Sequence, residues 1–139
     1  MKTKKIGIAV LILLLIVAFV AYNMYNKPHV NVSETSSDIT ITAAEILNDF
    51  TADETSANAI YLEKIIEVTG VISDIKVERQ KGIITLKTND DFGSVLSNLS
   101  DEATKDISSL KVGQTVTLKG ICTGYLMDVI LVKCEIIND

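Results

Sequence analysis

The sequence predicts a mostly β domain in which five short strands close into one small barrel, preceded by one transmembrane helix and a short helical segment. Three observations carry this prediction. Sixteen of the seventeen residues from Ile6 to Tyr22 are apolar, as in a membrane helix. From Ile65 onward, valine- and isoleucine-rich stretches alternate with polar residues, and glycines fall at turn-like intervals. The links between these stretches are too short for the crossover helices of a parallel sheet.

Length and charge limit the classes of function. The 139 residues suit one domain of ordinary size. All eighteen acidic residues follow Tyr22, whereas Lys2, Lys4 and Lys5 precede the apolar run, so the domain carries a formal charge of −8 against −5 for the whole chain. Because sequence-independent nucleic-acid affinity comes mainly from Lys and Arg, this balance disfavours nucleic acid and favours cationic or neutral partners.

Residues 1–25 have the charged start and apolar run of a bacterial export signal. The apolar run reaches about 25 Å at ~1.5 Å per residue, within the lower range for spanning a bilayer. Few pairs of small residues near the end of the run suit positions −3 and −1 of a signal-peptidase cleavage site. Tyr22 and Tyr25 suit an interfacial aromatic belt. We therefore expect an uncleaved signal anchor, with a cleaved signal peptide and a buried core helix as alternatives.

The anchor also predicts location. Lysines before the apolar run keep the N-terminus in the cytoplasm, so we expect a single-pass membrane protein, held through Ile6–Tyr22, whose C-terminal domain is extracytoplasmic (periplasmic). Secretion after signal cleavage is the alternative. No cysteine follows the run at a lipoprotein acylation site.

Residues 26–39 read as a polar linker. They contain Pro28, His29 and a Ser/Thr/Asn/Glu-rich stretch, which is typical of a tether. With no second histidine and no cysteine nearby, His29 is better explained as a solvated linker residue than as a metal ligand.

The domain, residues 40–139, begins with two expected helices. Thr42 and Glu45 fit a capping box, and the residues that follow supply the apolar face of a short helix. A second helical stretch covers residues 53 to 62. Together they form a helical preface to the barrel.

Five strands then follow by pattern. The first is long and slips in its alternation near Gly70, which predicts a bulge or bend. Ser100 caps an expected helix between the third and fourth strands, with Ala103, Ile107 and Leu110 on its buried stripe. The expected strands are residues 66–77, 83–87, 92–96, 115–122 and 129–136. We expect the last two to point these residues inward: Val116, Leu118, Gly120 and Cys122, then Ile130, Val132, Cys134 and Ile136.

Three strands, a helix and two strands, with a long bent first strand, is the plan of the OB-fold, a five-stranded, partly open barrel. Several segments also resemble the tRNA-anti-like family of bacterial OB-fold proteins, many of them described as lipoproteins. They include Ile66–Gly70, Gly113–Gly120 and Cys122–Val129, and the resemblance covers residues 40 to 136. It implies the fold but no catalytic residues. The missing acylatable cysteine is a departure from the lipoprotein members.

The candidate binding residues follow from how OB-folds bind, through strands two and three and the loops that join strands one to two and four to five. That region collects Lys76, Arg79, Lys81 and Lys87 against Glu78, the one basic patch of the domain. A solvated basic strand face explains this patch better than phosphate binding does, and a non-nucleic ligand or a protein partner is the remaining alternative. Binding of single-stranded nucleic acid also requires aromatic side chains on which bases can stack, and Tyr125 in the last loop is a candidate. An exposed loop tip there would suit a partner, unless it folds over the barrel end.

The chemistry of the remaining residues predicts no enzyme. No paired carboxylates, no nucleophile with a base and no phosphate-binding glycine loop are present in the sequence, and we expect no cofactor or metal. Cys122 and Cys134 are a possible disulfide, as is common in exported proteins. However, a turn centred on Leu126 and Met127 would place Cys122 opposite Leu131, which leaves buried free thiols as the alternative.

The sequence therefore predicts a non-catalytic, membrane-anchored, extracytoplasmic OB-fold module that binds a protein, peptide or small ligand. Two alternatives stay open: a single-stranded nucleic-acid-binding OB-fold, and a structural or assembly component of an envelope complex.

Overall fold

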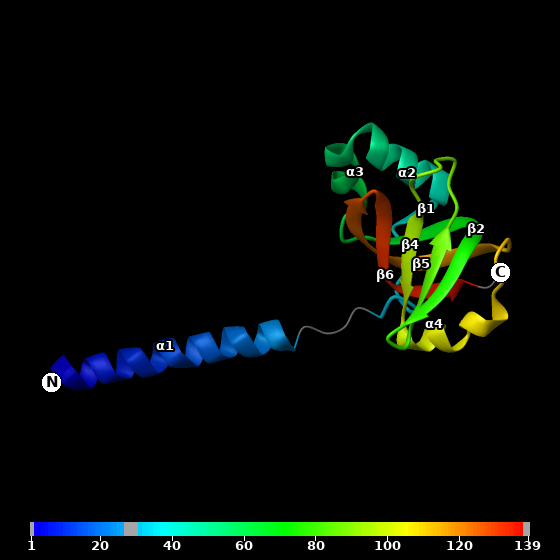
Figure 1. Ribbon diagram of the computed structural model, residues 1–139. Coiled ribbons are helices and arrows are strands. Elements are labelled where there is room, and N and C mark those ends of the chain that lie inside the picture. Colours follow the sequence, from blue (N-terminus) through cyan, green and yellow to red (C-terminus); the bar gives the residue numbers. More distant parts are fainter. Residues whose placement is uncertain (1, 27–30, 138–139) are drawn as a thin grey trace. The chain divides into compact units, whose positions relative to one another are not determined.

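The computed structural model describes residues 2–26 and 31–137. It divides the chain into two compact units, Met1–Val30 and Asn31–Asp139, which are described separately (Figure 1). Pro28 and His29 of the predicted linker lie outside the described residues.

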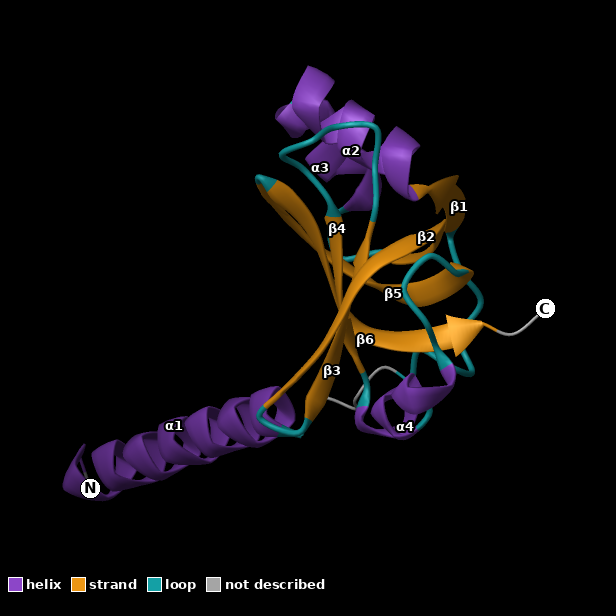
Figure 2. Cartoon of the chain, turned by 45° about the vertical axis from the view of Figure 1, so that its right-hand side comes forward, coloured by secondary structure: helices purple, strands orange, loops and turns teal. Residues whose placement is uncertain are grey.

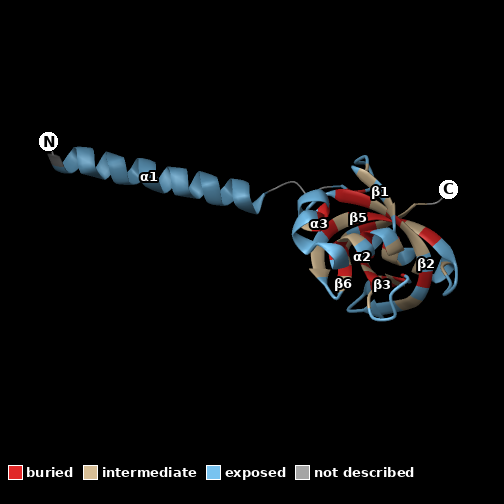
Figure 3. Cartoon of the chain, turned by 90° about the horizontal axis from the view of Figure 1, so that it is seen from above, coloured by how far each residue is buried: buried red, intermediate tan, exposed pale blue. Residues whose placement is uncertain are grey.

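The first unit is the helix α1 (Lys2–Tyr25). Its residues Thr3–Tyr25 are long and apolar enough to cross a membrane, because 23 residues reach about 35 Å and a bilayer core needs about 30 Å. Figure 3 shows the helix exposed along its length, and its large apolar residues are between 49% and 91% exposed. Such a surface fits a membrane anchor and differs from that of a buried core helix.

The second unit is built around a closed barrel (Figure 2), formed by five of its strands. In sheet order the strands run β2-β3-β4-β6-β5, and β5 returns to pair with β2. Only β4 and β6 run parallel among these pairs. This arrangement is the OB-fold that the sequence predicted. The strands are β2 (Ile65–Glu78), β3 (Lys81–Leu86), β4 (Val95–Leu99), β5 (Thr115–Leu126) and β6 (Asp128–Ile137).

Strand β2 closes the barrel because its two halves pair with different partners. Residues up to Val71 pair with β5, and residues from Ile72 pair with β3, with a register shift between Ile72 and Asp74. The bend expected near Gly70 therefore lies slightly later. Gly70 has another role: a Cβ there would lie 3.0 Å from the Cβ of Ala43, so glycine lets the first helix of the domain approach the strand.

Residues 31–39, predicted as part of the linker of residues 26–39, lie in the second compact unit of the structure. Strand β1 (Ile39–Thr42) pairs in parallel with β2 and adds a sixth strand to the sheet. Before it, Val32 is buried, and the Lys119 ammonium donates hydrogen bonds to the carbonyl oxygens of Ser33 and Thr35 at 3.3 and 2.9 Å. These contacts hold the segment against the outside of β5.

Two helices, α2 (Ala43–Ala52) and α3 (Glu54–Tyr61), cover one end of the barrel. The capping box predicted at Thr42 and Glu45 is present, and Asp53 caps α3 through its carboxylate. The Tyr61 hydroxyl donates to Asp49 at 2.5 Å and so ties the two helices together. Burial and this bond raise the pKa of Tyr61.

The short helix α4 (Asp101–Lys105) and a 3₁₀ turn (Ile107–Ser109) cover the other end. Ser100 caps α4 as predicted. The helix is shorter than expected, although Ala103 is buried and both Ile107 and Leu110 pack against the core.

Two strand predictions were wrong in detail. The third strand, expected at residues 92–96, runs from Val95 to Leu99, because a hydrogen-bonded loop occupies Asn89–Ser94. In β6 the inward residues are Val129, Leu131 and Cys134, and not Ile130 and Val132. The alternation shifts at Lys133, whose φ of 53° marks an irregular position in the strand.

Gly120 marks the tightest approach inside the barrel. A Cβ there would lie 2.5 Å from the Cys134 Sγ and 3.1 Å from the Val132 carbonyl oxygen. Larger residues therefore have no room unless β6 moves.

We predict that Gly120→Ala lowers the free energy of unfolding by about 1–3 kcal/mol through overpacking. In a Cys134→Ala background the contact with Sγ is removed and the Val132 carbonyl oxygen is the closest remaining atom, so the same substitution costs less. Urea unfolding of the four proteins of this cycle, followed by circular dichroism, measures the difference. Equal costs in both backgrounds would contradict the steric explanation.

Candidate functional site

The outer face of β3, β4 and β6 is the candidate binding surface. Its outward residues alternate with the buried ones along each strand. Leu96 lies opposite Ile130 across the parallel pair, and Thr85 lies opposite Leu96 on the other side. The hairpin turns that join β2 to β3 and β5 to β6 flank this face at opposite ends (Figure 2).

This face carries an apolar strip of four side chains. They are partly exposed and are not among the residues that pack against the core. The Asn98 amide, beside them, donates to the Leu131 carbonyl oxygen at 3.2 Å. The strip consists of Ile83, Leu96, Ile130 and Val132. Apolar side chains on the outside of a sheet, with a polar neighbour at the edge, suit a partner that brings its own apolar side chains.

The structure brings together three of the four predicted basic residues. Lys76 lies opposite Ile83, Lys81 lies opposite Glu78, and Arg79 occupies the turn between β2 and β3. Lys87 follows the far end of β3, about 20 Å from Lys81 at ~3.3 Å per residue. It therefore does not belong to the same patch.

Carboxylates accompany these basic residues. Lys76 pairs with Asp74 at 3.4 Å, and Lys81 with Asp101 at 3.8 Å; each of these side chains is about half exposed or more. Exposed pairs of this kind add little stability, but they cancel the positive field that a phosphate backbone needs. The basic patch is thus a mixed-charge surface.

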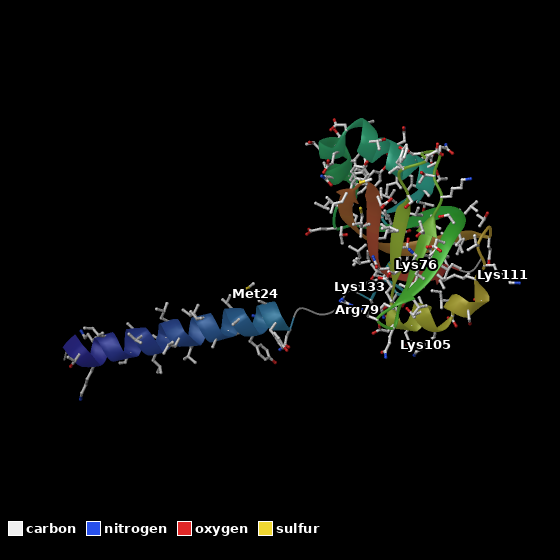
Figure 4. All side chains as sticks on the ribbon, in the orientation of Figure 1. Met24, Lys76, Arg79, Lys105, Lys111 and Lys133 are labelled. Atoms are coloured by element: carbon white, nitrogen blue, oxygen red, sulfur yellow. The ribbon has the colours of Figure 1, made fainter. Side chains whose placement is uncertain are left out.

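The sequence prediction missed two lysines near this end. Figure 4 shows Lys105 and Lys133 toward the part of the barrel where Lys76 and Arg79 lie. Lys105, on α4, pairs with Glu102 at 2.9 Å. Lys133 sits at the irregular position of β6, which no residue pattern in the sequence marked.

Tyr125 is placed against the core and away from the outer strip. Its ring stacks on Phe50 with centroids 5.6 Å apart and an interplanar angle of 21°. Phe50 and Tyr61 are themselves buried. Among the described residues of the domain, only the Phe92 ring is free, and it stands on the loop between β3 and β4. The strand face therefore has no aromatic platform for bases.

Cys122 and Cys134 are both buried, and the structure has them as free thiols. The register explains this, because Cys122 lies opposite Leu131 as the turn position indicated. Burial raises the pKa of Cys134 to about 12, an effect that the neighbouring Ser97 hydroxyl partly offsets, and it also raises the pKa of Cys122. Within residues 2–26 and 31–137, no cluster of histidine, cysteine and acidic residues suits a metal ion.

A closed barrel with an open outer sheet face and helices at both ends defines an OB-fold binding module. The family model confirms the resemblance seen in the sequence. The chain belongs to the tRNA_anti-like family, whose model matches residues 1–136.

Solved structures share the fold. A Klebsiella pneumoniae protein described as a candidate nucleic acid-binding lipoprotein is 21% identical, with a TM-score of 0.63, and the match covers 75% of this chain and 100% of that one. The Schizosaccharomyces pombe Stn1–Ten1 complex (18% identity, TM-score 0.43) matches over 54% of this chain and 59% of that one. The asparaginyl-tRNA synthetase of Pyrococcus horikoshii (16% identity, TM-score 0.43) matches over 57% of this chain and 20% of that one. No functionally curated protein matches the chain.

The buried thiols predict a pH dependence. A thiol whose pKa is raised on folding keeps its proton in the folded state and loses it first in the unfolded state. The free energy of unfolding therefore falls as pH rises above about 9 toward about 12. Comparing wild type with Cys134→Ala by urea unfolding at several pH values isolates the contribution of this group, which has an upper limit of about 1.4 kcal/mol per pH unit. Identical pH slopes would contradict it.

Proposed function

We propose that the protein is a non-catalytic, membrane-anchored module that binds a protein or peptide outside the cytoplasm, on the outer face of β3, β4 and β6. The observation that carries this proposal is the apolar strip of Ile83, Leu96, Ile130 and Val132, which the fold leaves partly exposed on the outside of the sheet. A partner that covers the strip removes apolar surface from water, the main favourable term in most protein association.

Nucleic acid is the less favoured ligand. The cationic residues at the β2–β3 turn are interspersed with carboxylates, and the strip carries no ring. The Klebsiella relative, whose description includes nucleic-acid binding, makes oligonucleotides the alternative to test.

The binding face is tested by site-specific crosslinking in membranes. We expect a photoreactive residue at Leu96 to capture a discrete protein partner, and we expect the additional substitution Ile130→Lys to reduce the yield about tenfold because it places a charge in the apolar contact. A photoreactive residue at the exposed Val112 is the matched control. Equal capture from both positions would count against the proposal.

Oligonucleotide titration tests the alternative. With the full chain at micromolar concentration, labelled single-stranded DNA and RNA are expected to show no binding that weakens with salt. Salt-dependent binding that Arg79→Ala reduces would replace the protein partner with nucleic acid.

The proposed orientation has its own test. Lysines before the apolar run place the N-terminus in the cytoplasm, so protease added to intact spheroplasts should degrade the domain while a cytoplasmic marker survives. A domain that resists until the membrane is dissolved would reverse the topology.

A further inference from the structure

The end of the domain that carries α2 and α3 has a groove that is separate from the outer face of β3, β4 and β6. It lies between α2 and the β3–β4 loop and has a volume of about 630 Å³. Leu47 and Ala44 line it on the helix side, and Phe92 lines it on the loop side.

Hydrogen bonds within the β3–β4 loop hold Phe92 in an exposed position. Its ring is 85% exposed, and its backbone N–H donates to the Asp90 carboxylate at 2.9 Å. The buried Thr88 hydroxyl donates to the Gly93 carbonyl oxygen at 2.5 Å. Because side chains and backbone fix this loop from within, the ring stays beside the groove and does not fold into the core.

Two further contacts lock the loop to its surroundings. Ser94 donates from its N–H and its hydroxyl to the Asp128 carboxylate at 2.8 and 2.7 Å, which joins the loop to the β5–β6 turn. A Cβ at Gly93 would lie 2.8 Å from a methyl group of Leu47, so glycine lets the loop rest on α2. The loop is therefore organised before any partner arrives, which lowers the entropy lost on binding.

The groove is acidic on both sides. Glu45 on α2 and both Asp90 and Asp91 on the loop line it, and no basic residue does so among the residues that the structure describes. The stretch from residue 38 to residue 63 contains six acidic residues and no lysine or arginine. Lys76, Arg79 and Lys105 lie away from α2, toward the β2–β3 turn and α4 (Figure 4), whereas Lys87 comes directly before the loop. The end of the domain that carries α2 and α3 thus has an excess of acidic residues.

From this arrangement we infer a second interaction surface: the groove between α2 and the β3–β4 loop takes a cationic, amphipathic protein segment. Lysine or arginine side chains meet the carboxylates at the rim, an apolar side chain packs against Leu47 and the Phe92 ring, and a cation over that ring gains further attraction. Anionic membrane surfaces and nucleic acid are repelled by the same carboxylates. This surface stands apart from the outer sheet face, so it does not depend on the function proposed above.

The test uses the full chain in nanodiscs of zwitterionic lipid and a dye-labelled peptide of Lys-Leu-Gly-Lys repeats, with Glu-Leu-Gly-Glu and Lys-Ser-Gly-Lys peptides as probes of charge and apolar content. Anisotropy should show binding of the first peptide only, weakening as salt rises. We expect Phe92→Ala to weaken it about five- to tenfold and Asp91→Lys to weaken it at least about threefold.

Matched controls make the outcome decisive. Val112→Ala removes an exposed apolar side chain elsewhere, and Asp106→Lys makes the same charge change beside α4; both should leave the affinity unchanged, as should Leu96→Lys on the outer sheet face. The chain has no tryptophan, so Phe92→Trp provides a single reporter whose emission should shift to shorter wavelength when the peptide binds.

The inference is overturned if the Lys-Leu-Gly-Lys peptide does not bind, if it binds the Phe92→Ala and Val112→Ala variants equally, or if the acidic peptide binds as tightly. A Phe92→Trp emission shift caused by anionic vesicles and not by the peptide would assign the surface to lipid and overturn it as well. Loss of peptide binding in Leu96→Lys alone would show that the peptide uses the outer sheet face.

Discussion

Strand β2 is the element on which the rest of the domain depends, because it pairs with β1, β3 and β5. A strand can pair with β5 through its first half and with β3 through its second half only if it is long and bends between the two halves. The register shift after Ile72 provides the bend, and the closed barrel leaves no free edge among its five strands. The outer face of β3, β4 and β6 exists because this closure buries their other face.

Two glycines let α2 and the β3–β4 loop pack closely against their neighbours in the domain. Gly70 admits Ala43, so α2 lies tightly on β2, and Gly93 admits Leu47, so the β3–β4 loop lies tightly on α2. The second contact places Phe92 beside the groove. A binding surface of the domain thus rests on the same helix that covers its core.

Much of the fold could be predicted from sequence because local signals and tertiary packing agree there. Hydroxyl and acidic residues at helix starts predicted the caps at Thr42 and Ser100, and alternation predicted the buried face of β5. Prediction failed where the pattern was degenerate. Residues 129–132 are all apolar, so alternation could not tell which of them face inward. The irregular conformation of Lys133 shifts the alternation in this strand, and the sequence does not show that shift. Strand β1 was missed because four residues in a polar stretch carry too little pattern, and its pairing with β2 is what orders it.

The sequence by itself determined a helix long and apolar enough to cross a membrane, the order of the five barrel strands, the barrel class and the acidic charge of the domain, since each of these depends on local pattern or composition. Only the tertiary structure decided which residues share a surface. Lys87 is separated from Arg79 by the length of β3, Tyr125 stacks on Phe50, and Glu45 of α2 lies across a groove from Phe92. The reason is physical: surfaces are assembled by strand register and loop packing between residues that are distant in the chain, and composition does not encode those distances.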